Sequence, residues 1–368
     1  MIIAVNTIFT GSSSYAASYR LYERLFTEWV QRYPRLQFVF LVAADFRLAI
    51  TGNNATVIAV KTPSGNRIRF NWWNRYSLPR IIRATNAERL VAATGFSCSA
   101  AGLPEFILAG SFFSREITGT ESALERMLLH RRQVSLRRAR GVFTFSATLK
   151  KRMLERYEWS GREMPLIALP VSPQYRPLHF EERQLVQASF TNGCAYFLTD
   201  AAAAQPDELV FLLKAFSAFK KRQRSAIRLV IVGDTGVLEG LPEKLDTYRF
   251  KSELELLNGI SEADRARLTA AAYAVVLPGG TPGNPLPAME ARACAVPVIC
   301  IAASEGRLVY GEQALEVPQD DYQELAAQMM ILYKDEQSRQ ALVQHLLQEN
   351  NPAGDKATTV DLLSLLKS

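Results

Sequence analysis

The clearest structural signal in this sequence is Ala274-Val-Val-Leu-Pro-Gly-Gly-Thr-Pro-Gly-Asn-Pro-Leu-Pro-Ala-Met-Glu-Ala291. Its first four residues are apolar and predict a buried strand, and the Gly- and Pro-rich residues after them predict a loop. Pro287 suits the first turn of a helix, where a missing N–H costs nothing. A strand, a glycine-rich loop and a helix in this order are typical of parallel α/β sheets.

The same stretch predicts a ligand site. Free backbone N–H groups at the start of the predicted helix point into the loop and, together with the helix dipole, favour a phosphate. Glu290 lies one turn into that helix, where its carboxylate could accept hydrogen bonds from vicinal hydroxyls such as those of a ribose. The alternative is a plain strand–loop–helix unit whose glycines only serve the turn. The pattern by itself leaves both interpretations open.

Outward from this stretch, apolar strands and amphipathic helices alternate in both halves of the chain, which predicts two doubly wound Rossmann-like domains. A length of 368 residues also favours two domains. Three prolines between Pro170 and Pro177 interrupt the alternation. We therefore expect a first domain over residues 1–172, a linker over 173–188, a second domain over 189–352, and a C-terminal helix over 353–368 that can pack back on the first domain.

Composition narrows the class of protein. The four cysteines show no CxxC spacing and the three histidines are scattered, so no metal site is predicted. We find no apolar run of the ~18 residues that a membrane span needs. The segment Met1–Asn6 enters a strand pattern directly and lacks the features of a signal peptide, which predicts a cytoplasmic protein.

The net charge of +7 is uneven, because basic residues crowd the stretch from Arg126 to Lys151. Such a cluster favours an anionic partner, and attachment to the inner face of a membrane is one interpretation. A solvated helix face is the other. Nucleic acid is not predicted, because the cluster lacks interleaved aromatic residues and a known motif.

The segment Leu286–Ile299 resembles the donor-site motif of the family 4 retaining glycosyltransferases, Leu-Pro-x-x-Glu-Ala-x-Ala-x-x-x-Pro-Val. Other segments resemble parts of this family in the family's own order and cover nearly the whole chain. They are Met1–Thr7 with Gly11, Trp72–Arg80, Gly95–Ser99, Phe143–Ser146 with Lys150 and Lys151, Leu169–Leu178 and Leu229–Gly233.

The resemblance implies the GT-B fold, in which two Rossmann-like domains face a central cleft. It implies a nucleotide-sugar donor on the second domain, a saccharide or lipid-linked acceptor on the first, retention of the anomeric configuration, and no metal ion or other cofactor. It assigns no catalytic residue. The positions that it places near the donor or in the cleft are Gly279, Gly280, Thr281, Leu286 and Glu290 for the donor, Gly11, Ser12 and Ser13 for a loop near the diphosphate or acceptor, and Gly110, Ser146, Gly233 and Asp234 as further candidates.

The chain departs from the family pattern at three places. Pro282 stands where the family usually has a second glutamate, and Gly110 with Ser111 stands in place of a His-Asp pair. The stretch Thr199–Asp207 has two acids and no basic residue where the family often carries an Arg and a Lys. A hydrogen bond to a charged group contributes roughly 1.5–3 kcal/mol. Losing two cations could therefore lower donor binding or turnover about a hundredfold or more.

Three interpretations of these departures stay open. The alignment is offset, other cations such as Arg249, Lys251 or Arg307 substitute, or catalysis has been lost. Two hypotheses of function follow from them. One is an active glycosyltransferase; the other is an inactive relative that binds a nucleotide, a glycan or a partner glycosyltransferase. A nucleotide-sugar epimerase of the same fold is a third option.

Overall fold

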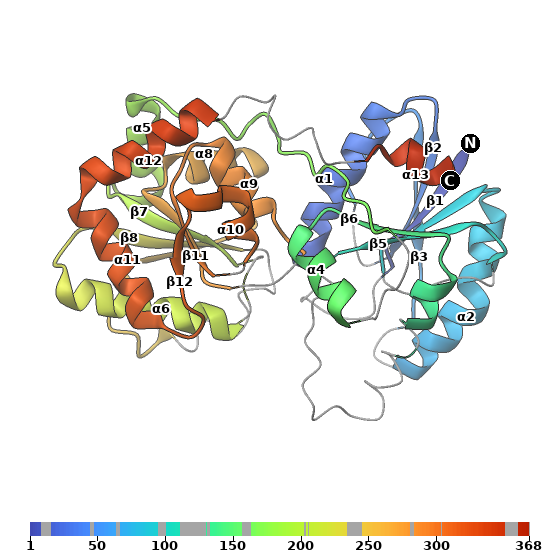
Figure 1. Ribbon diagram of the computed structural model, residues 1–368, viewed down its shortest axis with the longest axis horizontal. Coiled ribbons are helices and arrows are strands. Elements are labelled where there is room, and N and C mark those ends of the chain that lie inside the picture. The colour runs from blue at the N-terminus through green and yellow to red at the C-terminus, as the bar shows by residue number, and fades with distance from the viewer. Residues whose placement is uncertain are drawn as a thin grey trace. The chain divides into compact units, whose positions relative to one another are not determined.

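The structure is a computed structural model, shown in Figure 1. It divides into two compact units, Met1–Pro170 together with Thr358–Ser368, and Val171–Ala357. The residues that it describes are 1–8, 16–44, 48–63, 67–94, 101–110, 130, 133–156, 163–201, 204, 206–233, 245–279, 283–302, 304–349 and 360–367.

The first unit is built on a six-stranded parallel sheet of order β3-β2-β1-β4-β5-β6. Its strands are β1 Ile2–Asn6, β2 Gln37–Ala43, β3 Ala55–Val60, β4 Arg89–Ala92, β5 Glu105–Ala109 and β6 Gly141–Thr144. Its helices are α1 Ala16–Arg32, α2 Arg67–Ala84, α4 Ala147–Arg156 and α13 Leu362–Lys367.

The second unit repeats this plan with a parallel sheet of order β12-β11-β10-β7-β8-β9. Its strands are β7 Tyr196–Asp200, β8 Arg228–Gly233, β9 Leu254–Asn258, β10 Ala274–Leu277, β11 Val298–Ile301 and β12 Leu315–Val317. Its helices are α5 Phe180–Thr191, α6 Pro206–Arg222, α8 Glu262–Ala271, α9 Leu286–Ala293, α10 Glu305–Tyr310, α11 Tyr322–Lys334 and α12 Glu336–Glu349, with short 3-10 helices η5 Lys251–Glu253 and η6 Gly311–Gln313.

Both sheets have the doubly wound order in which the chain starts in the middle, runs to one edge, and returns to fill the other. Apolar side chains cover both faces of the second sheet in separate clusters. One cluster packs α6 and α11 against the strands, and the other packs α8 and α9. Strands buried on both faces explain why the sequence shows continuous apolar runs rather than alternation.

In the first unit, the aromatic row on α1 is core. Tyr22, Phe26 and Trp29 are buried, and adjacent ring centroids lie 5.6 and 5.1 Å apart. Their three- and four-residue spacing directs them to one face of the helix, against Phe40 of β2.

The sequence pattern from Ile81 to about Arg89 suggests a helix, and this prediction is wrong, because α2 ends at Ala84 and Arg89 begins β4. Asn86 adopts a left-handed φ of 54°, which no helix can continue through, and α2 instead runs back through Pro79 to Arg67.

Two further differences lie in the second unit. Helix α5 begins at Phe180, inside the range expected to be linker, and its Val186 joins the core of the second sheet. The sequence pattern from Asp321 to about Leu347 predicts one helix, but the structure has two. The Asp335 side chain accepts a hydrogen bond from the Ser338 N–H at 2.9 Å and caps the start of the second.

Candidate functional site

The carboxyl edge of the second sheet gathers the predicted donor residues that the structure describes. β7 pairs with β8 on one side and with β10 on the other, so the winding of the sheet reverses between β7 and β10. Ligands of open α/β sheets bind outside the carboxyl ends of the strands at such a reversal. Asp200 ends β7, Gly233 ends β8, and Gly279 lies two residues after the end of β10.

Helix α9 starts at Leu286 with Pro287 in its first turn, as the sequence predicts. Its cap residue, Pro285, supplies no side-chain hydrogen bond to the first turn. Gly283 has a φ of 89°, in the left-handed region, which lets the chain turn into the helix. This local geometry supplies backbone donors and the positive end of a helix dipole beside the strand ends.

Glu290 lies in the middle of α9 and is only 2% exposed. A carboxylate this deeply buried must be held by hydrogen bonds, since its desolvation is costly. Its charge also acts on Cys294, whose pKa is raised first by burial and then by Glu290. Glu290 is therefore a buried carboxylate on α9, one turn after the start of the helix.

Two more carboxylates bracket the loop between β10 and α9. The Glu208 carboxylate, in the first turn of α6, lies directly against Gly279, where a Cβ atom would come within 2.0 Å of Oε2. Glu305 begins α10, and its Oε1 accepts a hydrogen bond from the Gly283 N–H at 2.8 Å. Sequence reasoning missed both residues, since neither lies in a recognisable motif. Negative charge beside this loop would repel a phosphate placed there.

A buried arginine lies at the carboxyl edge of the second sheet. The Arg265 guanidinium, from α8, donates to Asp200 Oδ2 at 2.8 Å, and both side chains are buried. Asp200 ends β7, so the pair stands at the reversal of the sheet. Because Asp200 neutralises Arg265, the pair offers less positive charge than an unpaired arginine would.

The cations that the sequence suggested as substitutes are engaged elsewhere. Lys251 pairs with Asp246 at 2.9 Å, and Arg307 forms an ion pair with Glu316. Arg249 lies over the Phe250 ring at 5.6 Å. None of these contacts is with a residue of the loop between β10 and α9.

In the first unit, the predicted site residues that the structure describes contact other parts of the fold. Gly110 follows β5 and is packed against the Tyr22 hydroxyl, which would lie 2.2 Å from a Cβ atom there. Ser146 follows β6 and caps α4, because its Oγ accepts a hydrogen bond from the Leu149 N–H at 2.9 Å. The remaining predicted site residues lie outside the described ones: Gly11, Ser12, Ser13, Asp234, Gly280 and Thr281.

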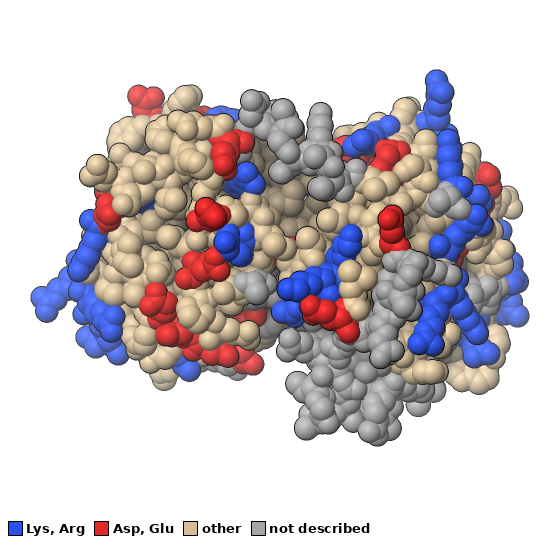
Figure 2. Space-filling view, in the orientation of Figure 1, with Lys and Arg blue, Asp and Glu red and all other residues tan. Residues whose placement is uncertain are grey.

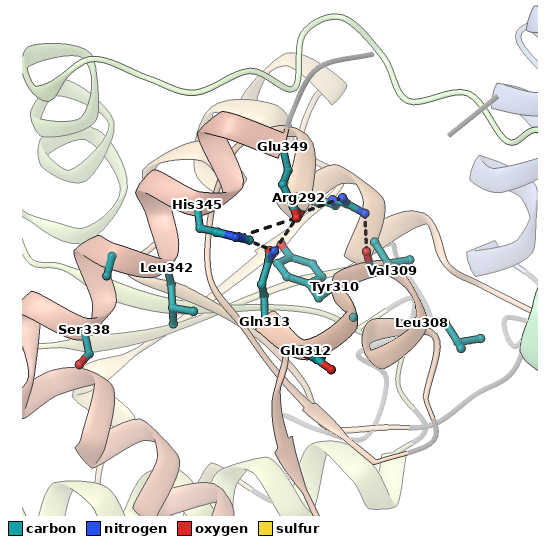
Figure 3. Close-up of a pocket in the computed structure, with 12 residues that line it drawn as sticks. Arg292, Leu308, Val309, Tyr310, Glu312, Gln313, Ser338, Leu342, His345 and Glu349 are labelled. Carbon is teal, nitrogen blue, oxygen red and sulfur yellow. Dashed lines mark hydrogen bonds and ion pairs between the residues drawn. The ribbon is translucent and has the colours of Figure 1, made fainter. Parts of the chain in front are cut away.

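A hollow of about 830 Å³ lies in the second unit, between the α10–η6 segment and α12 (Figure 3). Gln313 Nε2 donates to Glu349 Oε2 at 2.7 Å and lies 2.6 Å from His345 Nδ1. Arg292, from the last turn of α9, lies 3.4 Å from the same Glu349 oxygen and donates to the Val309 carbonyl at 2.6 Å. This network ties α9, α10 and α12 together, and none of the predicted site residues lines it.

Two features are absent from the described part of the chain. No helix within it is long and apolar enough to cross a membrane. Within the same ranges, no group of three or more His, Cys, Asp or Glu side chains is placed to hold a metal ion.

Comparison with known proteins gives the class of fold. Residues 201–346 match the family model described as glycosyl transferases group 1. No curated protein matches the chain in sequence. The structure is similar to WaaG, a glycosyltransferase involved in lipopolysaccharide biosynthesis, with a TM-score of 0.69 and 12% identity over 96% of both chains.

Two other solved structures agree with this result. Sucrose-phosphate synthase from Thermosynechococcus elongatus has a TM-score of 0.71 at 14% identity, over 95% of this chain and 94% of its own. Anabaena HepE in complex with UDP-glucose has a TM-score of 0.69 at 13% identity, over 95% and 94%. The chain thus has the GT-B fold with two Rossmann-like domains, which confirms the predicted fold class.

Proposed function

We propose that this protein transfers a sugar from a nucleotide-sugar donor to a saccharide or lipid-linked acceptor. The observation that carries the proposal is the start of α9 at the carboxyl edge of the second sheet, with Glu290 buried beneath it. The α9 start offers N–H donors to a phosphate and Glu290 offers an acceptor to ribose hydroxyls. The family match covers this region, and HepE was solved with UDP-glucose bound.

The finer points of the proposal follow the family resemblance. Transfer would retain the anomeric configuration and need no metal ion, because backbone amides and the helix dipole would take part of the diphosphate charge. Gly279, Gly280, Thr281 and Leu286 would line the donor, and Gly11, Ser12 and Ser13 would face the diphosphate or acceptor. We assign no catalytic residue.

A second candidate function is an inactive relative that binds a nucleotide, a glycan or a partner glycosyltransferase. The observation that favours it is the acidic side chain of Glu208 against Gly279, directly after the stretch Thr199–Asp207 that lacks the expected cations. Repulsion from this carboxylate would weaken diphosphate binding and turnover, while the fold itself would be unaffected.

We propose that the protein acts in the cytoplasm, at the inner face of a membrane. The basic stretch Arg126–Lys151 supports this proposal through its described members. Arg137, Arg138, Arg140 and Lys151 are exposed, and such cations are attracted to anionic headgroups.

The test is titration calorimetry with a panel of nucleotide-sugars and their nucleoside diphosphates, beginning with UDP-glucose. The wild type should bind one donor at micromolar strength, and Glu290→Gln should weaken it tenfold or more, since the amide accepts fewer hydrogen bonds from a hydroxyl pair. Glu181→Gln, an exposed glutamate on α5, is the matched control and should bind as the wild type does.

Thermal unfolding of Glu290→Gln shows whether the variant is still folded. If it is, weaker donor binding can be assigned to the lost contact. Product analysis with the donor that binds then decides between the two functions. A donor that binds and is transferred supports the glycosyltransferase. Binding without transfer to any saccharide acceptor supports the inactive relative, and no binding even at millimolar donor sinks the donor-site proposal.

A further inference from the structure

Helix α2 has one face in the core and one face of unusual composition. Phe70, Leu78 and Ile82 are buried in the cluster that covers β1, β2 and β3. The sequence of the helix, Arg67–Ala84, contains five arginines and no acidic residue. Since the apolar residues are turned to the sheet, most of the arginines must lie on the opposite side.

That opposite face carries two large aromatic side chains. Trp72 is 65% exposed and Tyr76 is 47% exposed. Their ring centroids lie 5.1 Å apart, as expected for side chains four residues apart on a helix. The Arg75 guanidinium lies 5.8 Å from the centre of the Tyr76 ring. Trp and Tyr each combine an apolar ring with a polar atom, which suits them to a boundary between water and an apolar phase.

Arginines continue the stripe at both ends. Arg69 precedes Trp72 by three residues and Arg80 follows Tyr76 by four, so all four side chains lie along one line of the helix. Both arginines are exposed. We call the set Arg69, Trp72, Arg75, Tyr76 and Arg80 the α2 stripe.

The sequence around the α2 stripe is also basic. Between Leu48 and Thr94 the chain holds seven Lys and Arg residues, and its one acid in that range is Glu88. That glutamate lies 3.6 Å from the N-terminal amine of Met1. In Figure 2, several blue side chains stand among tan ones in the part of this unit where Figure 1 shows α2.

We propose that the α2 stripe binds the surface of an anionic lipid bilayer. Trp and Tyr partition to the headgroup region, where the rings contact acyl chains and the polar atoms stay hydrated. Arginines beside them bind lipid phosphates and extend toward the headgroups. Because the apolar face of α2 packs on the sheet, its outer face, with the two rings and the arginines, is the face that can contact a bilayer surface.

Nucleic acid and plain solvent both fit the α2 stripe less well than a bilayer does. Single-stranded nucleic acid is bound in grooves that track its backbone, and the α2 stripe is a helix ridge whose two rings already contact each other. A solvated face rarely exposes a tryptophan to this extent. The inference rests on the membrane attachment proposed above and assigns it to α2, a different surface from Arg126–Lys151.

The experiment is sedimentation of the full chain with vesicles of phosphatidylcholine, with and without phosphatidylglycerol. Binding should require the anionic lipid and weaken as salt rises. Arg75→Ala with Arg80→Ala should lower the partition coefficient about 25-fold, at about fivefold for each arginine. Trp72→Ala with Tyr76→Ala should lower it about tenfold.

Matched variants assign the effect to this surface. Lys221→Ala with Arg222→Ala removes the same charge from exposed positions on α6 and should leave binding unchanged. Tryptophan emission should shift to the blue with anionic vesicles, and Trp72→Phe should abolish the shift. Neither measurement depends on a donor, so a failed donor assay leaves this test intact.

Several results would overturn the proposal. One is equal partition of wild type and both α2 variants. Another is loss of vesicle binding in the double variant Arg137→Ala with Arg138→Ala while both α2 variants still bind. That result would assign membrane binding to the Arg126–Lys151 stretch. A third is tight binding to poly-uridine that the α2 variants weaken, with no binding to vesicles.

Discussion

Glu208 and Gly279 belong to different elements, and their contact changes the expected charge of the donor site. Glu208 lies in the first turn of α6, Gly279 follows β10, and the carboxylate of one lies against the backbone of the other. A negative charge within a few ångströms of a phosphate lowers its affinity, to an extent that depends on how much water lies between them. The site therefore combines features that favour a phosphate, at the start of α9, with one that opposes it.

We predict that Glu208→Gln strengthens the binding of a nucleoside diphosphate. Removing one negative charge next to the loop should raise the affinity about three- to tenfold at low salt, and the gain should shrink as salt rises. Calorimetry with UDP on wild type and variant measures it. Asp246→Asn, which removes a charge from an exposed ion pair with Lys251, is the control. An unchanged or weaker affinity would mean that Glu208 does not face the phosphate.

The sequence could predict part of this site and not the rest. The strand end, the loop and the buried start of α9 are contiguous, so local patterns suffice to place Glu290 on its helix. The contact between Glu208 and Gly279 and the pair of Arg265 with Asp200 join elements far apart in the chain. Such contacts depend on how α6 and α8 pack over the strand ends, which periodicity does not specify.

Among the helices and strands, those that the sequence predicts best are the strands at the centre of a sheet. Runs such as Ala274–Leu277 and Val298–Ile301 are apolar throughout, because both faces of a central strand are covered. β3 and β12 lie at sheet edges, their side chains are partly exposed, and neither was predicted. The break between α11 and α12 was also missed, since it depends on the Asp335 side chain capping a helix inside a continuous helical pattern.

The start of α12 carries a charge cluster whose contribution to stability should depend on pH. Arg339 donates to both carboxylate oxygens of Glu336, at 2.8 and 2.6 Å, and the Tyr273 hydroxyl donates to Glu336 Oε2 at 2.9 Å. The Arg339 guanidinium also lies 4.5 Å from the centre of the Tyr273 ring. These contacts, the Arg339 hydrogen bond first, lower the pKa of Glu336 to about 2.

We predict that Glu336→Gln makes the free energy of unfolding less dependent on pH at acidic pH. A lowered carboxyl pKa stabilises the fold above the unfolded value of about 4.3, and this stabilisation is lost as the pH falls toward 2. Because Glu336 is half exposed, solvent screening reduces the effect to on the order of 1 kcal/mol. Urea unfolding should show the variant less stable at pH 7 and equal to the wild type near pH 2.

Glu181→Gln should leave this profile unchanged, since Glu181 is an exposed residue of α5, on a different helix from the cluster. A constant difference between wild type and Glu336→Gln from pH 7 to pH 2 would contradict the assignment. In that case the substitution would act through packing of the side chain and not through its charge.

At the scale of the whole molecule, the chain ends on the unit where it began. The Val360 N–H donates to the Leu166 carbonyl at 2.8 Å, and the Leu366 carbonyl accepts from Arg89 Nε at 3.2 Å. The Tyr33 hydroxyl donates to Asp361 Oδ1 at 2.5 Å. Burial, followed by this hydrogen bond, raises the pKa of Tyr33 to about 12. The sequence alone indicated a terminal helix that can pack back on the first domain, but not its partners there, which come from the end of α1, from β4 and from the segment after α4.

We predict that loosening α13 destabilises the first unit and leaves the second unchanged. Leu362 and Leu366 are buried, and replacing both by Ala should cost on the order of 3 kcal/mol, since a short helix can partly relax around the cavity. Hydrogen exchange should quicken at the amides of β4 and at Ile167, and stay unchanged in β10. Lys367→Ala, on the exposed side of α13, is the control. Faster exchange in β10 as well would mean that the two units unfold together, because the loss of α13 would then be transmitted to a sheet that belongs to the other unit.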